Sequence, residues 1–181
     1  MLTTILVGSS GSGKSTHAKT LGQVICSTDK YVEEQARILG VTYDKAFKMS
    51  QSIGIFKKFT KYFYEDIDYC VRNNKDFVID RTNLSSEMRC SLITKLREMA
   101  RKYGKTIIIK GVYFVTPENV IWQRLEHRKD IENKSIPAML VEEQIKKYQL
   151  PTTEEGFDYL IKKVWKLNEP IIRSLWLLML E

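Results

Sequence analysis

The sequence has 181 residues, of which 43% are hydrophobic and 28% charged. This length and composition suit one globular α/β domain with a normal core, and they exclude a disordered chain and a second catalytic domain. The formal net charge of +7 indicates an anionic partner. Nucleic acid is the favoured class of partner, although a bound nucleotide would account for part of the excess charge.

Cysteine usage and hydropathy indicate a reducing compartment without a membrane. The three cysteines, Cys26, Cys70 and Cys90, are odd in number, widely spaced and without a CxxC pair. They predict buried thiols, with no disulfide partner and no zinc site. No signal segment opens the sequence, and the apolar run 175–180 is far shorter than the roughly 20 residues that cross a bilayer. We expect a cytoplasmic protein, in the host cytoplasm if it is viral, with a packed C-terminal segment.

A glycine-rich loop follows the first predicted strand. Apolar residues predict a strand over 2–7 and a helix over 15–23. The loop that joins them reads Gly8, Ser9, Ser10, Gly11, Ser12, Gly13, Lys14, Ser15 and Thr16. Its glycines let backbone N–H groups point at a triphosphate, Lys14 can reach the β- and γ-phosphates, and the Ser15 hydroxyl can bind Mg²⁺. The flanking strand and helix favour a site for ATP or another nucleoside triphosphate over a flexible Gly/Ser turn.

The second predicted strand ends beside an aspartate. Residues 24–26 form a short apolar run, and Asp29 follows it at the carboxyl edge of the predicted sheet, where open α/β sheets bind their ligands. There Asp29 could accept the proton of an acceptor hydroxyl as a general base. The alternative is that Asp29 only caps the following helix.

The segment 43–73 has apolar residues at helical spacing, which predicts one or two helices. Lysines are interspersed at Lys57, Lys58 and Lys61, with aromatic residues nearby. They could bind the phosphates and bases of an acceptor. The alternative is a solvated helix face that includes a Lys61–Glu65 ion pair.

A third predicted strand, over 77–80, ends at Asp80. An acid in this place is typical of a Walker B strand, where it holds Mg²⁺ or the water bound to it. The alternative is an ordinary aspartate in a turn. For Arg81, Thr82 and Asn83 we expect a loop role rather than direct catalysis.

The second half of the sequence continues to alternate helices and strands. In chain order the patterns predict a helix over 85–104, a strand over 106–115, helices over 117–127 and 137–149, and a strand over 159–165. Gly111 indicates a β-bulge within its strand, and the charged stretch 128–135 interrupts the helical period. The alternation predicts an α/β fold with a mainly parallel sheet that is covered on both faces.

Two arginines four residues apart, Arg124 and Arg128, lie on one face of the helix predicted over 117–127 and its continuation. Such a pair could swing over the triphosphate and neutralise its charge. The alternative is that both are solvated and pair with nearby acids, at Glu126, Asp130 or Glu132.

Six segments in this order resemble the kinase domain of the polynucleotide 5′-kinase family, which occurs in phage end-healing enzymes and in polynucleotide kinase/phosphatases. They are Gly8–Thr16, Asp29–Tyr31, Val78–Leu84, Arg124 with Arg128, Ser135–Pro137 and Tyr148–Asp158. The resemblance covers nearly the whole chain and implies a single P-loop kinase domain over 1–181. That domain would have the three-layer P-loop NTPase fold and a helical, charged lid over about 124–137.

The resemblance also implies roles for particular residues. Asp29 corresponds to the general base that activates a 5′-hydroxyl, Lys14 and Ser15 to phosphate and Mg²⁺ ligands, and Arg128 to the lid arginine. One departure is Val32, where the phage enzyme has an arginine that holds the acceptor's neighbouring phosphate. A preference for a 3′-phosphorylated acceptor is therefore not implied for this chain.

Several acceptors are compatible with these motifs. The favoured one is the 5′-OH end of DNA or RNA, and the sequence does not distinguish the two or specify an oligomeric state. Alternatives are a hydroxymethylated base within DNA, a nucleoside or other small molecule, and aminoacyl-tRNA. A further alternative is a nucleotide-binding switch or an ATPase that transfers phosphate only to water.

Overall fold

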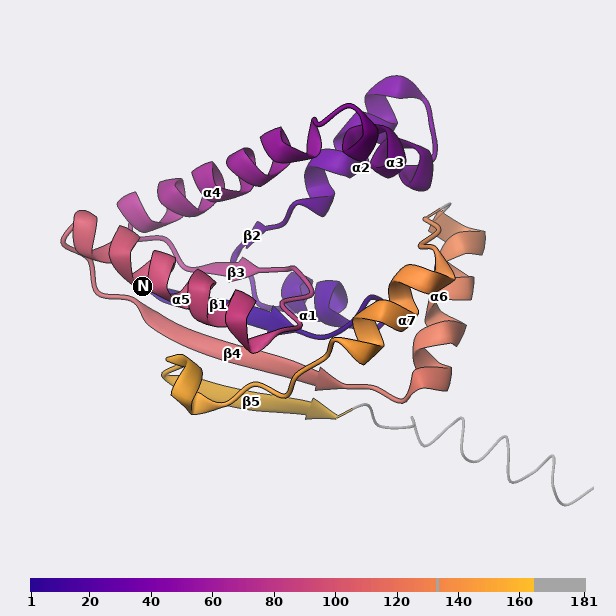
Figure 1. Ribbon diagram of the computed structural model, residues 1–181. Coiled ribbons are helices and arrows are strands. Elements are labelled where there is room, and N and C mark those ends of the chain that lie inside the picture. The colour runs from indigo at the N-terminus through magenta and orange to yellow at the C-terminus, as the bar shows by residue number, and fades with distance from the viewer. Residues whose placement is uncertain (133, 165–181) are drawn as a thin grey trace, which may run out of the picture.

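A parallel β-sheet forms the centre of the chain (Figure 1). The structure is a computed structural model that describes residues 1–132 and 134–164. Its five strands are β1 (Leu2–Val7), β2 (Val24–Cys26), β3 (Phe77–Ile79), β4 (Ile108–Val115) and β5 (Tyr159–Val164). They lie in the order β2-β3-β1-β4-β5, and every neighbouring pair is parallel. The predicted α/β class with a central parallel sheet is confirmed.

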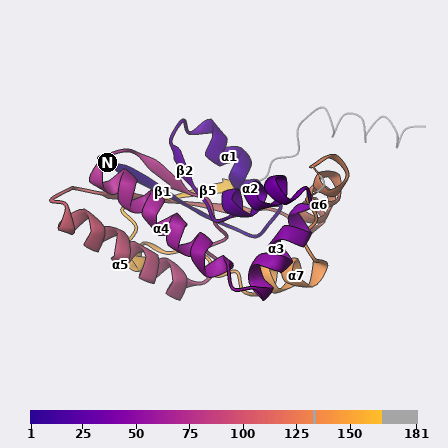
Figure 2. The same ribbon diagram turned by 90° about the horizontal axis from the view of Figure 1, so that it is seen from above.

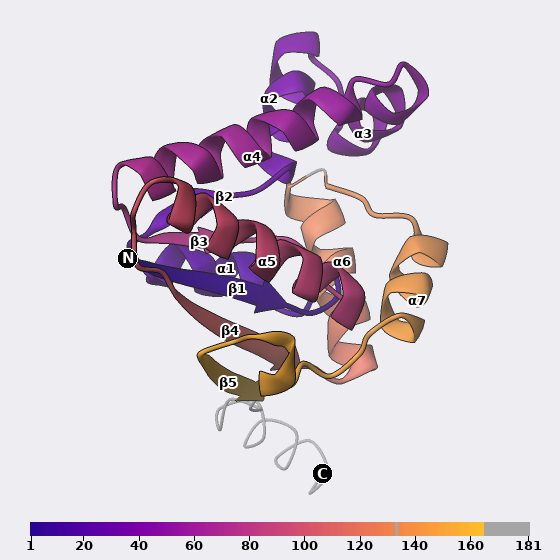
Figure 3. The same ribbon diagram turned by 60° about the vertical axis from the view of Figure 1, so that its left-hand side comes forward.

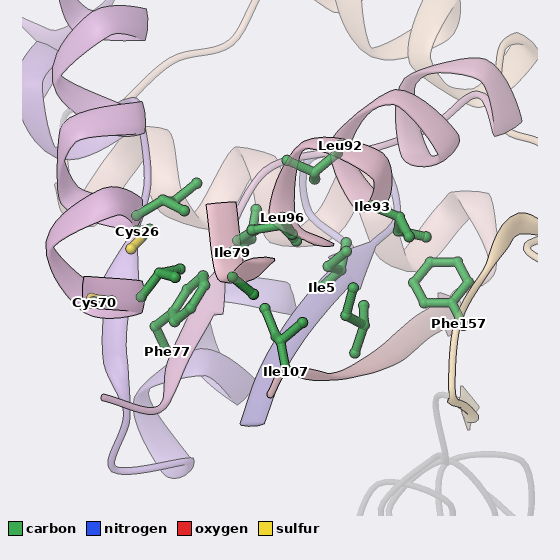
Figure 4. Packing of buried hydrophobic residues seen from close by; sticks show 14 of the residues in the cluster. Ile5, Cys26, Cys70, Phe77, Ile79, Leu92, Ile93, Leu96, Ile107 and Phe157 are labelled. Atoms are coloured by element: carbon green, nitrogen blue, oxygen red, sulfur yellow. The ribbon is translucent and has the colours of Figure 1, made fainter. Parts of the chain in front are cut away.

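Helices cover both faces of this sheet, as Figure 2 shows. Helices α4 (Phe56–Arg72) and α5 (Ser86–Lys102) pack on one face, and α1 (Lys14–Thr20) packs on the other. Strand β1 is buried on both faces, which explains its consecutive apolar residues Ile5, Leu6 and Val7. Figure 4 shows the larger core, where apolar side chains of α4 and α5 meet those of β1 and β3. Burial of these side chains holds the three layers together.

Two helix pairs lie beyond the carboxyl ends of the strands (Figure 3). Helix α2 (Asp29–Leu39) follows β2 and packs against α3 (Tyr43–Ser52), while α6 (Glu118–Glu132) follows β4 and precedes α7 (Ala138–Lys146). The first pair shares a small apolar cluster with the start of α4, and the second pair has a cluster of its own. Together with the strand ends, the two pairs therefore enclose a region at one edge of the sheet.

Gly111 does not form the predicted bulge. Strand β4 pairs through Gly111 with both β1 and β5 in an unbroken register. A Cβ atom there would lie 2.6 Å from Cδ2 of Leu160 and 2.9 Å from the ring of Phe157. The close packing of Leu160 and Phe157 therefore requires a glycine at this position. An isolated glycine within a strand is typical both of a bulge and of such close packing, so the sequence pattern does not distinguish the two.

Other predicted boundaries also shift. Helix α6 continues to Glu132 instead of ending near residue 127, because the charged side chains of its last turns lie toward solvent and do not oppose helix formation. The segment 43–73 forms two helices, α3 and α4. Strand β5 is described to Val164, so the end predicted at residue 165 and the packed segment predicted over 175–180 lie outside the described residues.

The predicted burial of the cysteines is confirmed for two of the three. Cys26 and Cys70 are buried free thiols, and Cys90 is half-buried and free. Among residues 1–132 and 134–164, no helix has both the length and the apolar character needed to span a membrane.

A buried ion pair fixes the loop that follows β3. The guanidinium of Arg89 is fully buried and donates to both carboxylate oxygens of Glu155 at 2.6 Å, and to the carbonyl oxygens of Asn83 and Leu84. Burial would raise the pKa of Glu155, but the hydrogen bonds and charge of Arg89 hold it below its usual value. Asn83, at a positive φ of 48°, donates to the carbonyl of Leu6 and ties this loop to the end of β1. This matches the loop role expected for Asn83.

We predict that Glu155→Gln destabilises the fold by about 3–5 kcal/mol, because it leaves the buried charge of Arg89 without a counter-ion. Urea unfolding measures the effect. The matched control is Glu154→Gln at the exposed neighbouring position, which should change the unfolding free energy by less than about 0.5 kcal/mol. Equal stability of the two variants would contradict the structural role of the pair.

Candidate active site

The loop Gly8–Thr16 curls between β1 and α1 in a conformation that suits a phosphate. Gly11 and Gly13 have φ angles of 80° and 99°, and a Cβ atom at Gly11 would lie 3.0 Å from the carbonyl oxygen of Ile121. Only glycine adopts this backbone without strain. The buried Lys14 ammonium lies inside the loop and donates to the carbonyl of Ser9 at 2.7 Å. The loop therefore has a glycine-dependent curl with Lys14 at its centre, which is compatible with the predicted phosphate cradle.

Helices α6 and α7 each form a hydrogen bond with this loop. The backbone N–H of Ser10 donates to Oε1 of Gln144 on α7 at 2.8 Å. Nη1 of Arg124 on α6 donates to the carbonyl of Gly11 at 3.2 Å. Burial lowers the pKa of Arg124 from its ordinary value. Arg124 is thus in contact with the phosphate loop itself, in the region where a lid arginine was predicted.

Two cavities meet beside the loop. The larger one, of about 910 Å³, follows the loop and α1. The smaller one, of about 170 Å³, lies between α3, the end of β3 and the start of α7. The residues that line both cavities are Lys14, Ser15, Asp29, Asp80 and Arg128. A group bound in one cavity would therefore face a group bound in the other across these five side chains.

Asp29 begins helix α2 and lies at this junction. The N-cap position belongs to Thr28, and the carboxylate of Asp29 accepts a hydrogen bond from the Lys134 ammonium at 3.4 Å. Its side chain is 53% exposed, so it is accessible from both cavities. The geometry favours the predicted position at a ligand site over a capping role alone.

Asp80 and Ser15 form an oxygen-rich pair beside Lys14. Burial raises the pKa of Asp80, while a hydrogen bond from Ser15 and the charge of Lys14 oppose this shift. Mg²⁺ is commonly bound by one or two carboxylates together with substrate phosphates and water, and this hydroxyl–carboxylate pair fits that donor set. In the described part of the chain, no group of three or more His, Cys, Asp or Glu residues could hold a metal ion by itself.

Arg128 lies close to both of its predicted partners, the phosphate site and a nearby acid. It lines both cavities, and its Nε donates to Oε2 of Glu132 one turn later at 3.1 Å. Its side chain is 28% exposed. The surface ion pair is weak in water, so the guanidinium can exchange Glu132 for a phosphate at little cost.

Lys134 is a site residue that the sequence interpretation missed. Its side chain is 9% exposed, its Nζ lies 2.7 Å from Oε1 of Glu33 and 3.4 Å from Oδ2 of Asp29, and it lies over the ring of Tyr43 at 4.2 Å. Through these contacts Lys134 links the segment between α6 and α7 to helices α2 and α3. Its position in the charged stretch 128–135, within the predicted lid, was the available signal.

The walls of the smaller cavity were also not predicted. Tyr43 and Phe47 on α3 stack with ring centroids 6.1 Å apart and planes at 19°. Ile136, Pro137 and Leu140 line the cavity from the α7 side. Burial raises the pKa of Tyr43, and the nearby Asp29 carboxylate adds to the effect. In the sequence these aromatic residues were indistinguishable from the core of an amphipathic helix, because their helical spacing is the same.

Two sets of predicted positions lie away from the cavities. Lys57, Lys58 and Lys61 are exposed on α4 and line neither cavity, and Lys61 pairs with Glu65 at 3.6 Å as the alternative interpretation expects. Val32 is fully buried in the apolar cluster of α2, α3 and α4. The Val32 side chain therefore contributes to helix packing, not to the site.

Comparisons with known proteins agree with the fold. A family profile described as an AAA domain matches residues 4–151, and no curated protein matches the chain. An inferred kinase from Chloroflexus aurantiacus is similar in structure, with a TM-score of 0.66 and 15% identity over 99% of this chain and 95% of that one.

Two further solved structures have the same fold. A fungal RNA kinase has a TM-score of 0.52 and 15% identity over 97% of this chain and 81% of that one. A structure of the PezAT chromosomal toxin–antitoxin system of Streptococcus pneumoniae has a TM-score of 0.57 and 13% identity, covering 90% and 68%. The molecule thus has a P-loop kinase-like fold.

The charge state of Lys14 predicts how nucleotide binding depends on pH. Burial lowers the pKa of Lys14 to about 8, although Asp80 and Asp29 oppose the shift. Above that pH the free protein has lost the proton, and a bound triphosphate would require it again. We predict that ATP affinity falls by about tenfold per pH unit above pH 8 until the pKa of the bound state is reached.

Calorimetric titration between pH 7 and pH 10 measures this dependence. Lys14→Met provides the control, since it should bind ATP weakly with no such slope. An unchanged affinity for the unsubstituted protein across this range would contradict the assignment of Lys14 to the phosphates.

Proposed function

Since this chain belongs to the AAA domain family and has a P-loop kinase-like fold, we propose that it is an ATP-dependent kinase. It transfers the γ-phosphoryl group to a polynucleotide hydroxyl, namely the 5′-OH end of DNA or RNA. The observation that carries the proposal is the junction of two cavities lined by Lys14, Asp29, Asp80 and Arg128. A phosphoryl donor on one side and an acceptor on the other would meet at these side chains.

The donor binds in the larger cavity, with its triphosphate in the loop 8–16. Lys14 contacts the β- and γ-phosphates, and Arg124 and Arg128 approach them from α6. Ser15 and Asp80 would hold Mg²⁺, which neutralises charge on the phosphates when it is bound. These residues supply positioning and positive charge, which are the main requirements of phosphoryl transfer.

The acceptor hydroxyl approaches from the smaller cavity, where Asp29 takes its proton. The acceptor oxygen forms a bond to the γ-phosphorus, and the bond from that phosphorus to the β,γ-bridging oxygen breaks. ADP leaves with the bridging electrons, and the proton of the hydroxyl remains on the Asp29 carboxylate. Lys134 keeps this carboxylate oriented through its 3.4 Å contact.

Three observations support a polynucleotide as the acceptor. The net charge of +7 favours an anionic partner. The smaller cavity, at about 170 Å³, has apolar walls that include Tyr43 and Phe47, which suit the planar ring of a single base. A fungal RNA kinase shares the fold. These features together favour the terminal nucleotide of a strand.

We predict that Asp29→Asn lowers kcat for phosphate transfer by about 10²- to 10⁴-fold, because the general base is lost. Binding of ATP should change little. Transfer from labelled ATP to a 5′-OH oligonucleotide and ATP calorimetry measure the two effects. Glu34→Gln, at an exposed position on the same helix, is the matched control and should keep full activity. Equal loss of ATP binding and transfer would refute the assignment.

A panel of acceptors tests the substrate class. It contains 5′-OH DNA and RNA oligonucleotides, DNA with hydroxymethylated bases, nucleosides and aminoacyl-tRNA. We expect labelled phosphate on the 5′-OH ends. Transfer to another member alone would change the acceptor, and rapid ATP hydrolysis without transfer to any member would replace the kinase by an ATPase or switch.

The exposed lysines of α4 provide a test of whether the nucleic-acid acceptor passes along this helix. If Lys57, Lys58 and Lys61 bind phosphates of a single strand, replacing all three by glutamine should reduce the slope of log K against log salt by about 2. The control removes three cations from α5, namely Lys95, Arg101 and Lys102. An unchanged slope in the α4 variant would make its lysines a solvated face.

A further inference from the structure

Two carboxylates and one ammonium meet at the start of helix α2. Asp29 and Glu33 are four residues apart, so they lie on the same face of this helix. The Lys134 ammonium contacts both, at 2.7 Å from Oε1 of Glu33 and 3.4 Å from Oδ2 of Asp29. Like charges at this helical spacing repel each other, and the lysine offsets that repulsion.

Lys134 is enclosed far more than an ordinary surface lysine. Its side chain is 9% exposed, and its ammonium also lies 4.2 Å from the centroid of the Tyr43 ring. Removing an ammonium from water costs free energy unless counter-charges replace the water. The two carboxylates and the aromatic ring meet this requirement, so the charge of Lys134 is compensated before any phosphate binds.

The two ion pairs of Lys134 are unequal. The contact with Glu33 has the length of a charge-assisted hydrogen bond, whereas the contact with Asp29 is longer than the usual range. Glu33 is therefore the principal counter-ion, and Asp29 shares the ammonium more weakly. This division matters for a general base, because a carboxylate that is tightly paired with a cation accepts a proton less readily.

The two cavities separate the surroundings of Asp29. Glu33 and Lys134 line the larger cavity and not the smaller one, whereas Asp29 lines both. The ammonium thus contacts the Asp29 carboxylate on the side of the larger cavity. The side toward the smaller cavity is left for the acceptor hydroxyl.

We propose that Glu33 and Lys134 are a positioning pair for Asp29. Glu33 anchors the ammonium, and the anchored ammonium orients Oδ2 of Asp29 without holding the carboxylate so tightly that it loses its basicity. Oδ1 then takes the proton of the acceptor hydroxyl. This inference rests on the proposed kinase activity, and it assigns control of the base to two residues that the sequence interpretation did not single out.

The test combines Glu33→Gln, Lys134→Met and the double variant. Lys134→Met should lower kcat by about 10- to 100-fold, because a small misplacement of a reacting group has an effect of this size. Lys134→Arg should recover part of the loss. Glu33→Gln should lower kcat by about 3- to 10-fold, because Asp29 then pairs with the ammonium alone.

The double variant shows whether the two residues act together. In the Lys134→Met background, Glu33→Gln should change kcat by less than about twofold, because Glu33 acts through the lysine. KM for ATP should stay the same in all these variants. Urea unfolding checks that each variant is folded, and Glu33→Gln, at an exposed carboxylate, tests the pair even if Lys134→Met does not fold.

Titration of the Asp29 carboxyl carbon by NMR provides a readout that a merely structural role would not move. Its midpoint should rise by about one pH unit in Lys134→Met, because a cation beside the carboxylate is lost. It should fall in Glu33→Gln, because the ammonium then serves Asp29 alone. The charge of Lys134 also acts on Asp80, so the titration is followed at Asp29 itself.

Other charged or titratable groups near Asp29 are unchanged in these variants. They are Lys14 on α1, Tyr43 on α3, Asp80 and Arg81 at the end of β3, and Arg128 on α6. The difference between the variants therefore reports on the pair.

Glu34→Gln and Lys129→Met are the matched controls. Glu34 is the exposed neighbour of Glu33 and pairs with Arg37, and Lys129 is exposed on α6. Both variants should keep kcat and the Asp29 midpoint. The proposal is overturned if Glu33→Gln and Lys134→Met shift that midpoint in the same direction, or if their effects on kcat simply multiply. It is also overturned if Lys134→Met acts mainly by raising KM for ATP, which would make the lysine a phosphate ligand.

The titration separates this inference from the proposed function, because it requires no transfer. Opposite midpoint shifts without transfer to any acceptor would refute the kinase and keep the positioning pair. Transfer with an unmoved midpoint in both variants would refute the pair and keep the kinase.

Discussion

Parallel pairing of β1 with β3 and β4 is the constraint on which the site depends. Parallel strands end at one edge, so the residues that follow β1, β2 and β3 must meet there although they are far apart in the sequence. Lys14, Asp29 and Asp80 are brought together in this way. The buried pair Arg89–Glu155 then fixes the loop after β3 against α5, so the edge keeps one geometry.

Charge at this edge is balanced only in part by the protein. Burial disfavours the ammonium of Lys14 and the carboxylate of Asp80, and each of the two charges partly stabilises the other. A triphosphate with Mg²⁺ would supply the opposite charges that the buried Lys14 and Asp80 lack. The site is therefore electrostatically preorganised for such a ligand. Lys134 extends the same arrangement, because its ammonium donates to the carboxylate of Asp29.

The helices beyond the strand ends complete the two cavities. Helices α6 and α7 contact the phosphate loop through Arg124 and Gln144, and α3 supplies the aromatic wall of the smaller cavity. The larger cavity is lined by the loop and α1 together with α6 and the ends of several strands, whereas the smaller cavity is assembled mainly from α2, α3, the end of β3 and α7. Differences in acceptor between proteins of this fold can therefore arise without any change in the loop.

The sequence by itself determined the features that depend on local order. Spacing and residue type were sufficient for the α/β class, the phosphate loop and the aspartates at the ends of β2 and β3, because motif and strand are adjacent in the chain. Tertiary structure decided what depends on distant contacts: the close packing at Gly111, the burial of Val32, and the burial of Lys134 beside Asp29. It also decided that Arg81 lines the smaller cavity and not the larger one, because the helices packed around a loop determine which cavity its side chains reach.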